Sequence, residues 1–321
     1  MKPPLDTTQR LTIADLPVQH ALQPGSAAQA RARFFNPGNA FDIQLPAVPD
    51  HVFTDEPARA LAEDTPTGLI ACDLSPVLAC PFPATAPLIL ARYGRIRAGE
   101  YLSTDFAASG VLCYVIRGRG SSRGPSGEIA WNSGDVFILP GGQPYSHSAA
   151  SDAVLWLVTN EPQLAFEALQ PPAPGQAPTD LVHYTADEIA RQLKMLQDIG
   201  RDEATAGIAV LFSSEHQEAS RNVMPTLTLA LNALPPGTSQ RAHRHNAAAV
   251  MLLIQTEGAY SLMDGRRKNW VPWATTVTPP QSVHSHHNDG QKQAVFLVVQ
   301  DGGLFYHLRT MGFAFAEHPC A

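Results

Sequence analysis

Histidines cluster in the last third of the chain in a way that suits a metal site. Five of the twelve histidines fall in the two short strings AHRHN and VHSHHN. His243 and His245 are two positions apart, so on a β-strand both side chains would lie on one face. His284 would return to them after a hairpin and a further strand. Three neutral imidazoles on one side of a mononuclear metal leave the opposite side open for chemistry. The pattern therefore predicts a metal centre at these three residues.

Two simpler interpretations compete with a catalytic centre. The histidines could be unrelated core or surface residues, which is the usual state of a single histidine but is less expected of a same-face pair with a third strand-borne partner. The site could also bind a metal without catalysis, as in a sensor or storage domain. The spacing leaves this second alternative open.

The elements that would position the histidines are mostly strands. Short β-branched and aromatic segments, separated by Gly, Pro and Ser, occupy about 85–160 and return from about 206. Between them lie a proline-rich linker at 171–178 and a predicted helix that begins at Thr185, whose capping box includes Glu188.

The two strand-rich halves repeat each other at a spacing of about 138 residues. In this alignment Asp105, Phe106 and Ala107 of the first half replace the histidine pair, and Tyr145 replaces His284. His147 lies close by but alone, so the first half is expected to bind no metal. The matching turn residues are Gly99 and Gly237, Gly120 and Gly258, and Pro140 and Pro279.

These features predict an all-β protein of two antiparallel β-barrels with a few short helices. A chain of 321 residues is long enough for two domains. We expect an N-terminal wrapping or interface region at 1–84, a metal-free barrel at 85–165, a linker and helix at 166–205, and a metal-binding barrel at 206–321.

Composition indicates a globular protein of the cytoplasm. Hydrophobic residues make up 44% and charged residues 16%, and the net charge of −7 favours neither nucleic acid nor an anionic membrane as a partner. No apolar run approaches the roughly 18 residues of a membrane span, and we expect no secretory signal. The cysteines fall in no CxxC spacing and are interpreted as thiols in a reducing compartment; they are Cys72, Cys80, Cys113 and Cys320.

The strings around the histidines resemble the two cupin motifs. Gly237, five residues and the HRH string match G(X)5HXH, without the glutamate that usually follows. Pro279, His284 and Asn288 match PXGXXHXXXN, with Gln281 in place of the glycine. The longer string HRHN…EG…DG…PPQSVHSHHND is similar to the bicupin gentisate, salicylate and 1-hydroxy-2-naphthoate dioxygenases, and the likeness is close over about 225–305.

This resemblance implies a bicupin fold, with barrels of the double-stranded β-helix or jelly-roll type, and an Fe(II) cofactor. Three imidazoles also accept Mn or Zn, either of which a crystal could contain. By the likeness His243, His245 and His284 bind the metal, and His286 is the catalytic histidine near the substrate and O2. The substrate-binding candidates are Arg241, Asn246, Trp273 and Asn288.

The chain departs from these relatives in two ways. They carry the metal in the N-terminal barrel, whereas the histidines here predict it in the second. Relatives that use carboxylated substrates have an arginine where this chain has Met251, so a carboxylate would lose one anchor. Arg221, Arg241 or Arg266 could replace it. The change also favours a neighbouring group, the hydroquinone dioxygenases, some of which have two kinds of subunit.

The expected function is that of an oxidoreductase of aromatic catabolism, an Fe(II)-dependent dioxygenase that inserts O2 into a substituted monocyclic phenol. Its partners would be a small aromatic substrate and O2, in a homo-oligomer or a hetero-oligomer with a second subunit. The alternative is a non-catalytic or non-oxygenase cupin that binds a small molecule through a divalent metal. Asp264 and Asp301 are either carboxylates that orient a ligand histidine or turn residues, since glycine follows each.

Overall fold

The computed structural model describes residues 12–200 and 205–316, so Cys320 lies outside the described residues. The chain divides into two units, Met1–Pro46 and Ala47–Ala321. The described part of the first unit contains a short 3-10 helix (Ile13–Asp15) and α1 (Ala27–Ala30). Its apolar side chains Leu22 and Phe41 are exposed. The wrapping or interface role expected for 1–84 remains a prediction.

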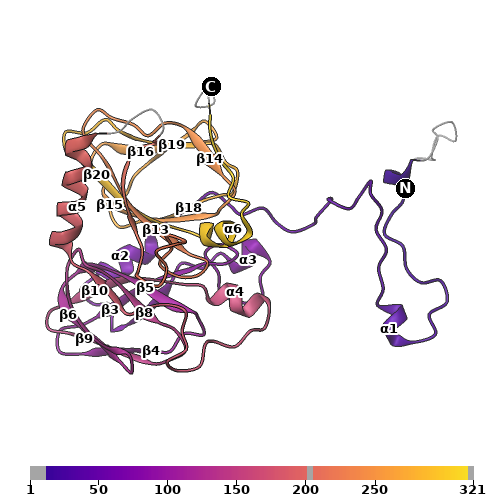
Figure 1. Cartoon of the computed structure of the whole chain (residues 1–321), viewed down its shortest axis with the longest axis horizontal. Helices are drawn as coiled ribbons and strands as arrows, with labels where there is room; N and C mark the ends of the chain where they lie inside the picture. The colour runs from indigo at the N-terminus through magenta and orange to yellow at the C-terminus, as the bar shows by residue number, and fades with distance from the viewer. Residues whose placement is uncertain (1–11, 201–204, 317–321) are drawn as a thin grey trace. The chain divides into compact units, whose positions relative to one another are not determined.

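The second unit contains two barrels, each made of two facing antiparallel sheets (Figure 1). In the first barrel the larger sheet has the order β11 (Val182–Tyr184), β8 (Val136–Pro140), β5 (Gly110–Arg117), β10 (Ala153–Thr159), β3 (Leu90–Ile96) and β2 (Gly68–Ala71). The smaller sheet has the order β4 (Tyr101–Thr104), β9 (Tyr145–Ala149), β6 (Arg119–Gly124) and β7 (Gly127–Asn132).

The second barrel repeats this arrangement. Its larger sheet has the order β1 (His51–Phe53), β18 (Thr275–Thr278), β15 (Ala249–Gln255), β20 (Ala294–Gln300), β13 (Thr228–Leu234) and β12 (Ile208–Phe212). The smaller sheet has the order β17 (Arg266–Asn269), β16 (Ala259–Met263), β19 (His284–Asn288), β14 (His243–His245) and β21 (Phe313–Phe315). The early strands β1 and β2 thus add an edge strand to the second and the first barrel respectively.

Short helices connect or cover the sheets. They are α2 (Asp55–Leu61), α3 (Ser75–Leu78), α4 (Glu161–Phe166), α5 (Ala186–Ile199) and α6 (Gly302–Leu308). The longest, α5, begins where the Thr185 side chain accepts a hydrogen bond from the backbone of Glu188, as the capping box predicts. None of the helices in the described ranges is long and apolar enough to cross a membrane.

The two larger sheets face each other across a shared apolar core, and each barrel also has an interior core of its own. Strand β10 shows why its sequence is apolar throughout. Trp156 and its alternate neighbours pack in the shared core, whereas Leu155 and Leu157 pack inside the first barrel. Both faces of the strand are buried, so the usual alternation of polar and apolar residues is absent.

Strand pairing corrects the alignment of the repeat by one position. His243 on β14 pairs with His284 on β19, and Thr104 on β4 pairs with Tyr145 on β9. Thr104, rather than Asp105, therefore occupies the place of His243. The prediction was wrong because the connection between the turn glycine and this strand is one residue shorter in the first barrel. Thr104 and Tyr145 replace two of the three histidines there.

Candidate metal centre

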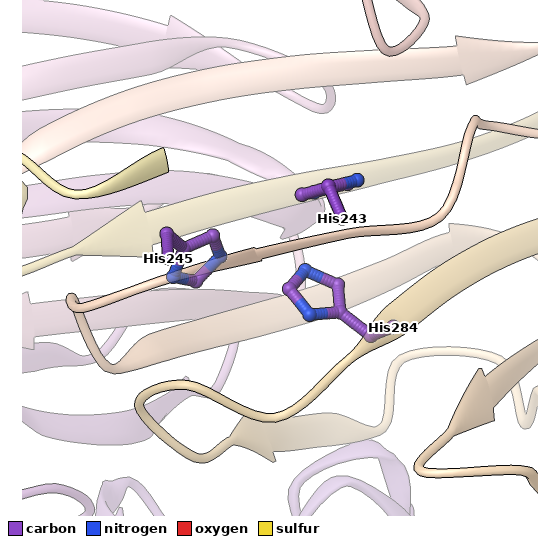
Figure 2. Close-up of side chains that lie close together, drawn as sticks. All are labelled: His243, His245 and His284. Carbon is purple, nitrogen blue, oxygen red and sulfur yellow. The ribbon is translucent and has the colours of Figure 1, made fainter. Parts of the chain in front are cut away.

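Three histidines from two neighbouring strands meet inside the second barrel. His243 lies directly opposite His284 in the β14–β19 pair, and His245 is two positions along on the same face. Figure 2 shows the three rings turned toward one another. One nitrogen of each ring lies within 4.8 Å of the others, and all three residues are buried. The alternation of a strand thus brings together the residues that the spacing predicted.

Backbone carbonyls determine which nitrogen of each ring carries the hydrogen. The Nδ1 atoms of His243, His245 and His284 lie 2.8, 2.8 and 2.9 Å from the carbonyl oxygens of Arg241, Ala247 and Ser282. A carbonyl oxygen only accepts, so each Nδ1–H donates. In a neutral imidazole the lone pair is then on Nε2, and such bonds orient histidine ligands in metal sites.

Burial keeps these imidazoles neutral. The pKa of His245 is lowered to about 4 and that of His284 to about 3, mainly by burial and also by the neighbouring histidines. The pKa of His243 is lowered by the same burial. Three neutral nitrogen donors with converging lone pairs fit a divalent transition metal such as iron, manganese or zinc.

A cavity of about 400 Å³ opens beside the three histidines. This volume is within the range of sites for small molecules. Apolar side chains such as Met251 and Phe296 form part of its wall, and Asn232 and Gln240 add polar groups. Among the described residues, Arg221 is the only lining side chain with a full formal charge. The cavity is therefore mostly apolar, with one cation and the metal-binding nitrogens.

His286 lines this cavity, but the four substrate-binding candidates do not. The Arg241 guanidinium lies 3.9 Å from the ring centroid of Phe315. The Asn246 amide bonds to the backbone of Thr310 and Gly312, and that of Asn288 to the backbone of Leu234 and Lys292. Trp273 packs against the shared core between the barrels. The structure therefore gives these four side chains structural contacts.

Sequence reasoning missed two polar residues of the site. The Gln300 amide on β20 lies 3.2 Å from Nε2 of His245, which brings a polar group from the facing sheet to the metal site. Ser261 on β16 bonds to His286 at 2.8 Å. The inward alternation of β16 and a matching Ser122 in the first half were the signals that could have identified Ser261.

Asp264 and Asp301 bond to backbone N–H groups rather than to the ligand histidines. Asp264 accepts from Val283, and Asp301 accepts from Ala248 at 2.8 Å. The turn interpretation therefore describes them better. Asp301 is buried, and this burial raises its pKa to about 7.

Asp301→Asn is expected to stabilise the protein more at pH 8 than at pH 6. An unfolded aspartate has a pKa near 3.9, so the folded chain holds the extra proton and loses stability as the pH rises toward 7. Asparagine keeps the acceptor oxygen without the buried charge, and its advantage should grow by about 1 kcal/mol between these pH values. Urea denaturation at both pH values measures this. The exposed Asp264→Asn is the matched control, and an equal gain for both variants would contradict the burial argument.

The second unit thus has the bicupin fold, with a three-histidine group in its second barrel. No family model matches the chain. Gentisate 1,2-dioxygenase from Ralstonia sp is 29% identical over 109 residues, which is 34% of this chain and 31% of the relative. Gentisate 1,2-dioxygenase 1 from Aquipseudomonas alcaligenes is 28% identical over 156 residues, 48% of this chain and 42% of the relative. The matches thus cover less than half of each relative's length.

A third relative and a solved structure extend the comparison. 1-Hydroxy-2-naphthoate 1,2-dioxygenase from Nocardioides sp. is 33% identical over 93 residues, 29% of this chain and 23% of the relative. Salicylate 1,2-dioxygenase from Pseudaminobacter salicylatoxidans superimposes with a TM-score of 0.71 at 15% identity, over 86% of this chain and 91% of that chain. At this identity the superposition shows the fold alone, and the fold is the one that the resemblance implied.

Proposed function

We propose that this chain is an Fe(II)-dependent ring-cleaving dioxygenase that inserts O2 into a substituted monocyclic phenol of the gentisate, salicylate or hydroquinone kind. The observation that carries the proposal is the set of three buried, neutral imidazoles whose Nε2 atoms converge beside a cavity of about 400 Å³. The relatives with sequence similarity are named as 1,2-dioxygenases, which supports oxygenase chemistry at this site.

His243, His245 and His284 would hold the iron, which supplies a centre at which an electron-rich phenol and O2 meet on one open side. The backbone acceptors at Nδ1 fix the three rings before the metal arrives, so little reorganisation accompanies binding. The apolar wall that includes Met251 and Phe296 excludes water from the aromatic ring of the substrate.

His286 is the proposed catalytic histidine. Its ring centroid lies 5.8 Å from that of His284, and burial lowers its pKa well below the usual value. A neutral imidazole in this place can donate a hydrogen bond to an oxygen of the substrate and exchange a proton with it. We assign to it the positioning and proton-transfer role.

Arg221 is the proposed contact for an acidic substituent of the substrate. It is the lining side chain with a full charge among the described residues, and it lies where the cavity adjoins a neighbouring surface pocket. The dioxygenases that this sequence resembles and that use carboxylated substrates have an arginine where this chain has Met251. Arg221 would therefore bind a carboxylate from a different direction.

Oxygen uptake tests the proposal directly. After anaerobic reconstitution with Fe(II), the full chain is expected to consume O2 with at least one of gentisate, salicylate and hydroquinone, because the site can hold both reactants on one metal. Gentisate and hydroquinone share the para-hydroxyl pattern and differ in the carboxylate, so their comparison tests the role of Arg221. Protein reconstituted with Zn(II), which has no redox chemistry, is the control.

Binding of a phenol without O2 consumption in all three assays would contradict the proposal. That result would favour the alternative, a non-oxygenase cupin that binds a small molecule through its metal. A homo-oligomer, a hetero-oligomer with a second subunit and a cytoplasmic location stay predictions from the sequence.

A further inference from the structure

The same chain of hydrogen bonds occurs inside both barrels. In the second barrel the indole Nε1–H of Trp270 donates to the hydroxyl of Ser261 at 2.8 Å, and this hydroxyl lies 2.8 Å from Nδ1 of His286. In the first barrel the corresponding residues are Trp131, Ser122 and His147, with distances of 2.9 and 2.7 Å. The serines and histidines pair across equivalent strands, Ser122 with His147 and Ser261 with His286.

The direction of each bond follows from the donors available. An indole nitrogen only donates, so the serine oxygen accepts from tryptophan and retains its own O–H for the histidine. If Nδ1 donated to the serine instead, the serine hydrogen would be left buried without an acceptor, which is costly. Ser261 is 4% exposed, so this cost applies. The network therefore puts the hydrogen of neutral His286 on Nε2.

The first barrel shows where that Nε2 hydrogen points. Nε2 of His147 lies 3.0 Å from the hydroxyl of Thr104, which closes the network inside a packed core. In the second barrel His243 occupies the place of Thr104 and directs its own Nε2 to the metal site. The Nε2 hydrogen of His286 is thus left beside the cavity, where the described side chains offer it no hydrogen-bond partner.

We propose that Ser261 and Trp270 are positioning residues that hold His286 with its hydrogen on Nε2, directed into the cavity. Two consequences follow. His286 offers the metal no lone pair, so the donor set stays at three histidines and the substrate side remains open. The same N–H is a fixed hydrogen-bond donor for a bound ligand oxygen. The second consequence rests on the proposed function, whereas the first does not.

Nitrogen NMR of the metal-free full chain with ¹⁵N-labelled histidine tests the tautomer without any assay of activity. Histidine-to-glutamine variants at 147 and 286 assign the two signals. In the wild-type protein both residues are expected to show an unprotonated Nδ1 that accepts a hydrogen bond and a protonated Nε2. Ser261→Ala should shift the His286 signals and leave those of His147 unchanged, and Ser122→Ala should do the reverse. A wild-type His286 with its hydrogen on Nδ1 would overturn the proposal.

Steady-state kinetics separates positioning from simple packing, because the first barrel offers a matched control. Ser261→Ala is expected to lower kcat by roughly 10- to 100-fold with bound iron unchanged, and Ser261→Thr, which keeps the hydroxyl, should recover most of it. Ser122→Ala removes the same bond and should lower the melting temperature similarly while kcat stays within about twofold. Equal kcat for the two alanine variants would refute the positioning role. If no phenol is turned over, the NMR result still decides the tautomer.

Discussion

His284→Ala is expected to abolish both iron retention and O2 uptake. The variant removes one of three nitrogen donors and leaves two, on a single strand, which cannot hold the metal on one face. Metal centres of this type contribute several kcal/mol to the transition state, so the rate should fall by more than about a thousandfold. Metal analysis of the purified, reconstituted protein and an oxygen electrode measure the two effects.

His147→Ala is the matched control for this experiment. It removes a histidine buried at the equivalent depth of the first barrel, where Thr104 and Tyr145 replace two of the metal-binding positions. The melting temperature should fall because Ser122 and Thr104 lose a buried partner, but iron content should remain that of the wild type. Loss of iron from the His147 variant would indicate a metal site in the first barrel and would contradict the assignment to the second.

The metal-free protein is expected to lose stability steeply as the pH falls from about 6.5 to about 4. Burial lowers the pKa of six of the described histidines, of which His287 is only partly buried. The five buried ones are His147, His243, His245, His284 and His286. In the unfolded chain each would take up a proton near pH 6.5, whereas in the folded chain it stays neutral to a lower pH. The unfolded state then binds more protons, so acid favours it.

The slope of this loss is large. Each responding histidine contributes about 1.4 kcal/mol per pH unit, so five would contribute up to about 7 kcal/mol per unit, against a typical total stability of about 5–15 kcal/mol. Denaturant titrations between pH 7.5 and 5 measure it. His147→Gln should reduce the slope by the contribution of one histidine, about 1.4 kcal/mol per pH unit. His307→Ala, at an exposed position, should leave the slope unchanged. Iron-loaded protein should resist acid longer, because iron binds the folded state. A flat profile between pH 7 and 5 would contradict this expectation.

The features that follow strand alternation were predictable from the sequence. The residues of the His243–His245 pair lie on one face because every second residue of a strand does, and His284 reaches them because its strand pairs with theirs. The internal repeat likewise predicted two barrels, and it showed that the first barrel lacks the three-histidine set. The capped helix α5 begins at the predicted residue because capping is a local interaction.

Side-chain roles that depend on tertiary packing were harder to predict. Arg241, Asn246, Trp273 and Asn288 lie near the histidines in the sequence or match their motifs, and none of the four lines the cavity. Proximity in sequence does not tell which side of a strand or turn faces the cavity. The Asn246 amide instead fixes the turn before β21, and residues from distant strands, Gln300 and Ser261, reach the histidines. A one-residue difference in loop length likewise displaced the inferred equivalent of His243.

Strands β1 and β2 decide whether the two barrels could exist as separate domains. The segment from His51 to Ala71 provides an edge strand to each barrel: β1 pairs with β18 of the second barrel, and β2 pairs with β3 of the first. Cleavage at the proline-rich linker would therefore not give two independently stable domains. The C-terminal fragment would lack β1, so the edge of β18 and its side of the shared core would be exposed to solvent. The first barrel, which lacks the three-histidine set, therefore still supports the second barrel through this segment and the shared core.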